Sequence, residues 1–247
     1  MLAGRIKLIE NYLFAIMITV VSVITAFCNI VSENIAESTF SEQENESLNC
    51  AYFPLVVIDP GHGGADCGAV GINGALEKDV NLQMSLKLAD LLTDAGYNVK
   101  LTRSEDVMLT DSLEHSTKKE SDLAARANLS ENGCIYISIH MNKFIMPEYS
   151  GLQVYYSENH PRSKLLATTI QKNVKSNLQT DNNREIKPGG ELYLLKAVKE
   201  ICVLVECGFL SNLDEAAMLT DELYQNKLAY ELFSAIDDFV IESNYSY

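Results

Sequence analysis

Three short apolar runs in this chain each lead to a side chain that can bind a metal ion or carry a proton. The side chains are His62, His140 and Glu206, and the runs that precede them are residues 55–58, 134–139 and 201–205. Apolar runs of this length are typical of buried strands. Because sites in open α/β sheets lie outside the carboxyl ends of the strands, we expect these three side chains to meet at one edge of a sheet.

From residue 53 onward, strand-like runs alternate with segments that have the periodicity of amphipathic helices. This alternation predicts a single α/β domain in which a mostly parallel sheet is covered by helices. The predicted strands are 55–58, 98–102, 134–139, 153–156, 192–195 and 201–205, and the predicted helices are 79–95, 122–129, 161–178, 213–219 and 223–241. Asp79 is the expected cap of the first helix. The third helix is expected to turn Leu165, Leu166, Ile170 and Val174 inward.

The start of the chain has a different character. Residues 12–31 are a run of twenty residues without a charge, which is about the length that crosses a bilayer. Two basic residues precede this run, while residues 32–52 form an acidic linker without a basic residue. The positive-inside rule therefore predicts a cytoplasmic N-terminus (1–11), a single-pass membrane anchor, and a domain (53–247) on the extracytoplasmic side. A cleaved signal peptide is the competing interpretation.

Charge and cysteine content exclude some classes of protein. The formal net charge of −15 argues against nucleic acid as a substrate or partner, because phosphate-binding surfaces are basic. The six cysteines include no Cys-x-x-Cys pair. Cys134, Cys202 and Cys207 lie in or beside apolar runs, so we expect them to pack as small hydrophobic side chains rather than to build a disulfide framework.

Glu77 follows His62 by fifteen residues and completes a His-Glu-His set with His140. Catalytic zinc takes three protein ligands and keeps one position open, so these three residues have the chemistry of a zinc site. Glu206 is then available as the general base that takes a proton from water and passes it to a leaving amine. Amide hydrolysis is the reaction that needs a polarised carbonyl, a stabilised oxyanion and such a base together.

Each assignment has a simpler alternative. Glu77 alone could be a solvated carboxylate at the start of a helix, and His140 could be a core histidine. The glycine-rich turn around His62 could cradle a phosphate, but it lacks the Gly-x-Gly-x-x-Gly and P-loop patterns. Glu206 is harder to assign to packing, because an unpaired buried carboxylate is costly.

The imidazole ligands of a metal usually have their second ring nitrogen anchored by another polar group. Asp59 and Asn142 are near enough in sequence to be candidates for this role. The two remaining histidines are weaker candidates for a site, because His115 lies in a polar segment and His160 directly precedes a proline.

Four motifs occur in the order found in the zinc-dependent N-acetylmuramoyl-L-alanine amidases of the amidase-3 type, and residues 55 to about 240 resemble that family. The motifs are Asp59-Pro-Gly-His-Gly-Gly64, Glu77-Lys-Asp79, Ser138-Ile-His-Met-Asn142 and Val205-Glu-Cys-Gly-Phe-Leu-Ser-Asn212. The resemblance implies a twisted, six-stranded, mostly parallel sheet flanked by helices. It implies zinc bound by His62, Glu77 and His140, and a catalytic Glu206. The reaction would hydrolyse the amide between N-acetylmuramic acid and L-alanine in peptidoglycan and so remove stem peptides.

A narrower resemblance is to the spore-cortex amidases, which prepare muramic acid for δ-lactam formation. It rests on length and on one catalytic domain behind one apolar segment, and it implies a location in the intermembrane space of the forespore. Met141 and Cys207 depart from the residues that are more common at their positions in the family. Neither residue is an expected metal ligand, so these departures bear on how the substrate fits and not on the reaction. The membrane anchor, or an envelope activator or recruiting protein, would bring the enzyme to its polymer. The rival hypotheses are another zinc peptidase of the envelope and a non-catalytic peptidoglycan-binding module.

Overall fold

The computed structural model describes residues 53–110, 117–130 and 135–244. The predicted anchor (12–31) and linker (32–52) lie outside these residues, as do His115 and Cys134. Among the helices that are described, none is both long and apolar enough to cross a membrane. The described part forms one α/β domain, as the alternation of runs predicts.

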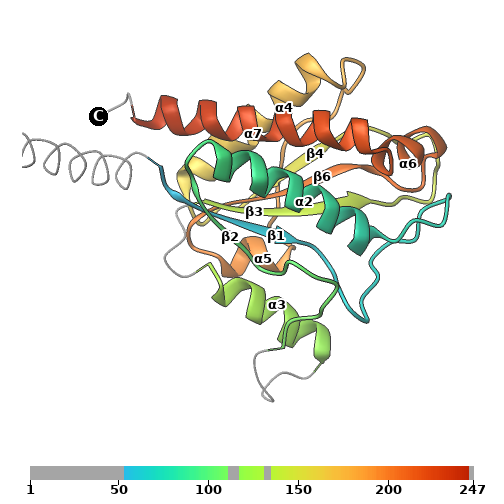
Figure 1. Ribbon diagram of the computed structural model, residues 1–247, viewed down its shortest axis with the longest axis horizontal. Helices are drawn as coiled ribbons and strands as arrows, with labels where there is room; N and C mark the ends of the chain where they lie inside the picture. The colour runs from blue at the N-terminus through green and yellow to red at the C-terminus, as the bar shows by residue number, and fades with distance from the viewer. Residues whose placement is uncertain (1–52, 111–116, 131–134, 245–247) are drawn as a thin grey trace, which may run out of the picture. The chain divides into compact units, whose positions relative to one another are not determined.

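A six-stranded sheet with the order β2-β1-β3-β6-β4-β5 forms the centre of the described domain. The strands are β1 (Leu55–Pro60), β2 (Asn98–Leu101), β3 (Ile135–Asn142), β4 (Gln153–Tyr156), β5 (Lys187–Pro188) and β6 (Ile201–Phe209). Paired strands run parallel except β4, which is antiparallel to β6. The predicted mostly parallel sheet is confirmed, and the carboxyl ends of β1, β3 and β6 therefore lie at one edge (Figure 1).

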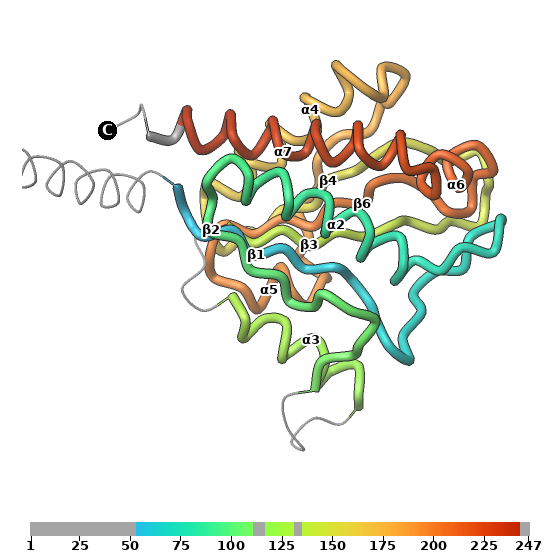
Figure 2. The backbone as a smooth tube through the Cα atoms, viewed as in Figure 1, coloured from blue at the N-terminus to red at the C-terminus, as the bar shows by residue number. Residues whose placement is uncertain are grey.

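Helices cover both faces of this sheet (Figure 1). The helices are α2 (Glu77–Asp94), α3 (Lys118–Asn128), α4 (Pro161–Asn177), α5 (Tyr193–Ala197), α6 (Leu213–Leu219) and α7 (Glu222–Asn244). Val56 and Ile58 pack into the larger core under α2, α4 and α7, whereas Val57 packs into the smaller core that includes α5. This division follows from the alternation of side chains along a strand. At the end of the sheet, the loop after β1 and the segment after β3 lie beside α6 (Figure 2).

Three local expectations are wrong. The run 192–195 was expected to be a strand, but Tyr193–Ala197 forms α5, because a short apolar run does not by its periodicity distinguish a strand from a buried helical turn. Leu165 was expected to face inward but is 47% exposed, while Leu166 is fully buried. The third error concerns where helices begin.

Helix α2 begins at Glu77 and not at Asp79, and no side chain caps it. The N–H groups of Glu77 and Lys78 donate instead to the carbonyl oxygens of Ala69 and Cys67, so the preceding loop satisfies the free donors of the first turn. Helix α3 similarly begins four residues before the predicted start, at Lys118. These boundaries depend on loop and capping contacts that the apolar periodicity does not report.

The carboxylate of Asp59 lies at the centre of a buried polar network at the end of β1. It accepts hydrogen bonds from Thr102 Oγ1 (2.6 Å), Ser138 Oγ (2.7 Å) and Arg126 Nη1 (2.7 Å). Burial raises the pKa of Asp59, but the charge of Arg126 and the two hydroxyl hydrogen bonds more than offset that effect, and the pKa lies below its usual value. A charged aspartate therefore ties α3, through Arg126, to the strand that leads to His62.

We expect Asp59→Ala to lower the free energy of unfolding by about 3 kcal/mol, because removing one partner of a buried ion pair typically costs about 3–5 kcal/mol. The lower end applies because Arg126 keeps its second partner, Asp122, at 2.7 Å. Urea unfolding at neutral pH measures the change, with Asp94→Ala, at an exposed position, as the control. The native pKa is depressed, so this contribution is full above about pH 4 and is lost on acidification. A change below about 1 kcal/mol would contradict a structural role for the pair.

Candidate metal centre

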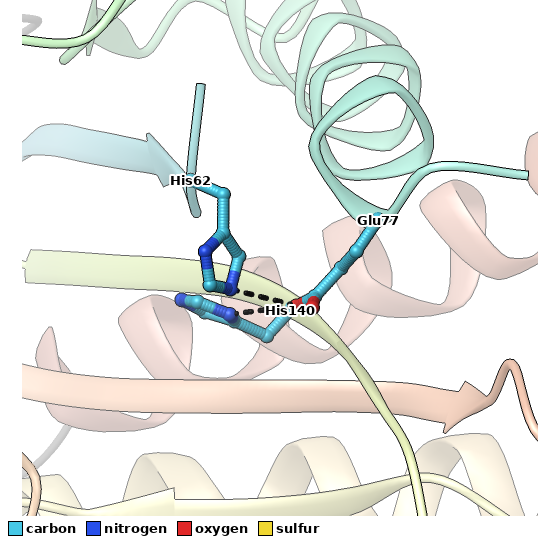
Figure 3. Close-up of side chains that lie close together, drawn as sticks. All are labelled: His62, Glu77 and His140. Carbon is cyan, nitrogen blue, oxygen red and sulfur yellow. Dashed lines mark hydrogen bonds and ion pairs between the residues drawn. The ribbon is translucent and has the colours of Figure 1, made fainter. Parts of the chain in front are cut away.

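The structure brings His62, Glu77 and His140 together at the carboxyl edge of the sheet. One ligand atom from each lies within 4.8 Å of the other two. His62 Nε2 lies 3.3 Å from Glu77 Oε1, and His140 Nδ1 lies 2.9 Å from the same oxygen. Figure 3 shows both imidazole rings directed at the carboxylate, from the loop after β1 and from β3, while Glu77 comes from the first turn of α2. Separate segments of the chain thus converge on one point.

The backbone presents His62 in a conformation that few side chains adopt. Its φ of 60° is positive, and it is the one non-glycine residue in the described ranges with that feature. Two buried arginines hold the preceding loop: Arg103 donates to the carbonyls of Pro60 (2.9 Å) and Gly61 (3.0 Å), and Arg126 donates to that of His62 (2.6 Å). A strained φ persists only where the surroundings over-determine it, and it is found most often at functional sites.

The group that anchors the imidazole of His62 is Asp66, whose Oδ2 lies 2.9 Å from Nδ1. Asp59 was a candidate for this role, but its carboxylate is committed to Thr102, Ser138 and Arg126. Asn142, the other candidate, makes no side-chain hydrogen bond to either imidazole in the described part of the chain. Asp66 lies within the glycine-rich motif, but spacing alone does not reveal its role, because the turn that brings it back to His62 is non-helical.

Glu77 is buried and remains charged. Its Oε2 accepts a hydrogen bond from the N–H of Ala69 (2.7 Å), and its Oε1 accepts one from the N–H of Met141 (3.1 Å). Burial raises the pKa of Glu77, but its hydrogen bonds and charge interactions with His140 and His62 outweigh burial, and the pKa lies well below its usual value. Two imidazole nitrogens and one charged carboxylate are the donor types of a catalytic zinc site, so the residues present fit this ion.

Two glycines make room for this cluster. A Cβ at Gly61 would lie 2.2 Å from Cε1 of His140, and one at Gly68 would lie 2.5 Å from Oε2 of Glu77. The imidazole of His140 therefore rests directly against the Gly61 backbone.

We expect Gly61→Ala to weaken zinc binding about 10- to 100-fold without altering any ligand, the range seen when groups that orient ligands are replaced. The new methyl group must displace the His140 ring. Competition with a chromogenic chelator measures the affinity. Gly190→Ala is the matched control, because a Cβ there meets only Glu158 Oε2 at an ordinary 3.7 Å. Equal zinc affinity of the two variants would contradict this account of the glycine.

Glu206 lies beside the cluster and outside it. Its Cα pairs with that of His140 across β3 and β6, so the two side chains share one face of the sheet. Its Oε2 is buried and has no hydrogen-bond partner among the described residues. Burial raises the pKa of Glu206 to about 7, the Glu77 charge adds to this shift, and the two imidazoles oppose it. A carboxylate that titrates near neutral pH and has a free oxygen is suited to proton transfer.

A cavity of about 170 Å³ adjoins the two imidazoles. Its walls include Leu123 of α3, Tyr193 of α5 and Leu204 of β6. It gives a ligand access to the His-Glu-His cluster from the face that α3 and α5 cover. His160 takes no part in the site: its Nδ1 accepts the N–H of Arg162 at the start of α4.

Comparison with known proteins gives a consistent result. The family model described as N-acetylmuramoyl-L-alanine amidase matches residues 56–238. The germination-specific N-acetylmuramoyl-L-alanine amidase of Bacillus subtilis (strain 168) is 36% identical over 186 residues, which cover 74% of this chain and 78% of that protein. The solved structure of the CwlD amidase from Clostridioides difficile, in complex with the GerS lipoprotein, has 38% identity and a TM-score of 0.71. That match covers 76% of this chain and 98% of the other.

Proposed function

The chain belongs to the N-acetylmuramoyl-L-alanine amidase family and is a peptidoglycan amidase, and we propose that it works with a zinc ion held by His62, Glu77 and His140. When bound there, zinc would polarise the scissile carbonyl and make water more acidic. The observation that carries the proposal is the buried Oε2 of Glu206, which lies beside the His-Glu-His cluster and has no hydrogen-bond partner in the described part of the chain. In this proposal the bond cleaved is the amide between the lactyl group of N-acetylmuramic acid and L-alanine.

Two carboxylates beside the cluster hold and transfer protons. Asp66 accepts the Nδ1 proton of His62, which leaves Nε2 free as a metal ligand. Glu206 takes the proton of the attacking water on Oε2 and passes it to the departing amine of L-alanine. The carboxylate makes this transfer readily, because burial brings its pKa close to neutral pH. The cavity lined by Leu123, Tyr193 and Leu204 gives the substrate access to the reacting atoms from the face that α3 and α5 cover.

Product analysis tests the proposed reaction. The purified chain, supplied with zinc, is incubated with intact peptidoglycan, and mass spectrometry identifies the new ends. We expect stem peptides that begin with L-alanine and glycans that carry a free lactyl carboxyl group, with loss of both on adding a chelator. Cleavage between two amino acids would instead indicate a zinc peptidase. Zinc binding without any product would favour a non-catalytic binding module.

The setting proposed for this activity is spore cortex maturation. This proposal is supported by the 36% identity to the germination-specific amidase of Bacillus subtilis, of which the match covers 78%. Removal of stem peptides yields the free lactyl group that muramic δ-lactam formation needs. Deletion of the gene would then leave a cortex with stem peptides in place of δ-lactam, which analysis of purified spores measures. A cortex with its normal δ-lactam content would contradict this setting.

Membrane attachment and a protein partner complete the proposal. The uncharged run 12–31 and its flanking charges support a single-pass anchor with the catalytic domain outside the cytoplasm. The lipoprotein bound in the CwlD structure supports an envelope lipoprotein as activator or recruiting partner. When the chain is produced in vegetative cells, protease added to intact protoplasts should remove residues 53–247 and spare the N-terminus if the orientation is right. Full activity and correct localisation of the chain by itself would remove the need for a partner.

A further inference from the structure

A second cavity, of about 850 Å³, lies between α6, the segment that precedes β4 and the segment that precedes β5. It is formed largely by polar residues of the 146–151 and 178–184 segments. Among the described residues that line it, Arg184 is the one lysine or arginine, whereas Glu148, Asp181, Asp214 and Glu215 are carboxylates. The mechanism above assigns no role to this arginine.

Two hydrogen bonds and two aromatic rings hold the guanidinium group of Arg184. Nε donates to the carbonyl of Ser150 (2.7 Å), and Nη1 donates to Oε1 of Gln153 (3.3 Å). Its central carbon lies 4.3 Å from the ring centroid of Phe209 and 5.4 Å from that of Tyr149. Stacking on aromatic faces and two hydrogen bonds orient a planar fork whose remaining N–H groups can bind a planar anion.

No carboxylate in the described ranges forms an ion pair with Arg184. Glu215 lines the same cavity, but its two oxygens accept the N–H groups of Gly151 (2.9 Å) and Phe209 (2.7 Å). An oriented arginine without an ion-pair partner is unusual in a chain with a formal net charge of −15. The carboxylates around it would repel an anion elsewhere in the cavity, so only the Arg184 end can accept one.

Arg184 is also close to the reacting groups. His140, Glu206 and Gln153 form a row across β3, β6 and β4, because their Cα atoms are paired on neighbouring strands. Neighbouring strands lie about 5 Å apart, so the guanidinium that contacts Gln153 is on the order of 10 Å from the Glu206 carboxylate. Glu206 and Arg184 each contact the substrate over a hydrogen bond of about 3 Å, so the substrate itself spans roughly 4–7 Å, which is about two extended residues.

We propose that Arg184 binds the free α-carboxylate of the D-glutamate that follows L-alanine in the stem peptide. This inference rests on the proposed reaction, which puts the scissile amide beside Glu206. The D-glutamate is joined onward through its side chain, so its α-carboxylate is free and lies one residue beyond the bond that is cleaved. A bidentate arginine–carboxylate pair at this place sets which stem peptides are cleaved and in which register they bind.

Paired substrates test the proposal. Three muramoyl tripeptides are compared as substrates. The first has D-glutamate at the second residue, the second has the α-carboxamide of D-glutamate there, and the third has a carboxamide only at the third residue. We expect the wild-type chain to lose about 10- to 100-fold in kcat/KM for the second-residue carboxamide and little for the third, since a hydrogen bond to a charged group contributes about 1.5–3 kcal/mol. Arg184→Gln should lower kcat/KM by the same factor on the carboxylate substrate, mainly through KM, and should no longer discriminate.

Controls separate recognition from folding. Arg184→Gln should cleave the carboxamide substrate as well as the wild type does, which a variant with a damaged fold would not. Arg184→Lys should recover part of the discrimination, and Lys164→Gln, at an exposed position on α4, should keep all of it. The proposal would be overturned if Arg184→Gln still preferred the second-residue carboxylate over its carboxamide as strongly as the wild type does. It would also be overturned if only the third-residue carboxamide lowered kcat/KM. Absence of any cleavage by the wild type would tell against the proposed reaction instead.

Discussion

Glu206→Gln is expected to reduce kcat about 100- to 10,000-fold, the usual contribution of a positioned general base. Glutamine has nearly the same shape as glutamate but accepts no proton, so it removes the chemical step alone. Zinc content should remain that of the wild type, because Glu206 lies outside the cluster formed by His62, Glu77 and His140. Steady-state hydrolysis of a muramoyl peptide and metal analysis of the same preparation measure the two quantities.

The matched control is Glu191→Gln, since the Glu191 side chain is 100% exposed. It removes a solvent-exposed carboxylate that has no part in the proposed reaction and should leave kcat unchanged. If Glu206→Gln retains wild-type turnover, another group must take the proton. If it loses zinc as well as turnover, Glu206 acts as a ligand and not as the base.

The second large effect is expected for the imidazoles. His62→Ala and His140→Ala should each lower zinc affinity by more than about 100-fold, beyond the 10- to 100-fold range seen for groups that only orient a ligand. Activity should fall with the metal content, because two donors hold the ion far more weakly than three. Equilibrium dialysis against a zinc chelator of known affinity measures the change.

Asp66→Asn provides a graded comparison with the ligand variants. Asp66 anchors Nδ1 of His62 but supplies no atom to the cluster. Its replacement should therefore lower zinc affinity by only about 10- to 100-fold. His160→Ala is the negative control, because that imidazole caps α4. Wild-type zinc affinity in His62→Ala or His140→Ala would contradict the proposed site, whatever the activity of the variant.

Much of the fold could be predicted because the relevant signals are local. The strand 153–156 and the helix 213–219 have the predicted bounds, β1 and β6 each contain the predicted run, and β3 contains the described part of its run, 135–139. Alternation of apolar residues and the turn residues between runs are sufficient for this. The start of α2 could not be predicted, since loop carbonyls from Ala69 and Cys67 replace the side-chain cap.

Parts of the site were also beyond the sequence pattern. The anchor of His62 is Asp66 and not Asp59. A turn brings the Asp66 carboxylate to Nδ1 of His62, whereas the Asp59 carboxylate accepts a hydrogen bond from Arg126. The run 192–195 became part of α5, which supplies a wall of the cavity beside the imidazoles. Both outcomes depend on which groups come into contact when the chain packs. The spacing of residues along the sequence does not report those contacts.

The sequence by itself determined which chemical groups stand at the strand ends: two imidazoles and a carboxylate after apolar runs, with Glu77 following the glycine-rich turn. Local patterns suffice for that, since strand and turn preferences act over a few residues. Only the tertiary structure decided how those groups are tuned. The hydrogen bond from Arg126 to the carbonyl of His62 joins residues 64 apart, and the charges that act on the pKa of Glu206, beside its burial, belong to His140, Glu77 and His62. Such contacts exist only after the chain has closed around them, because desolvation and charge interactions depend on distance in space.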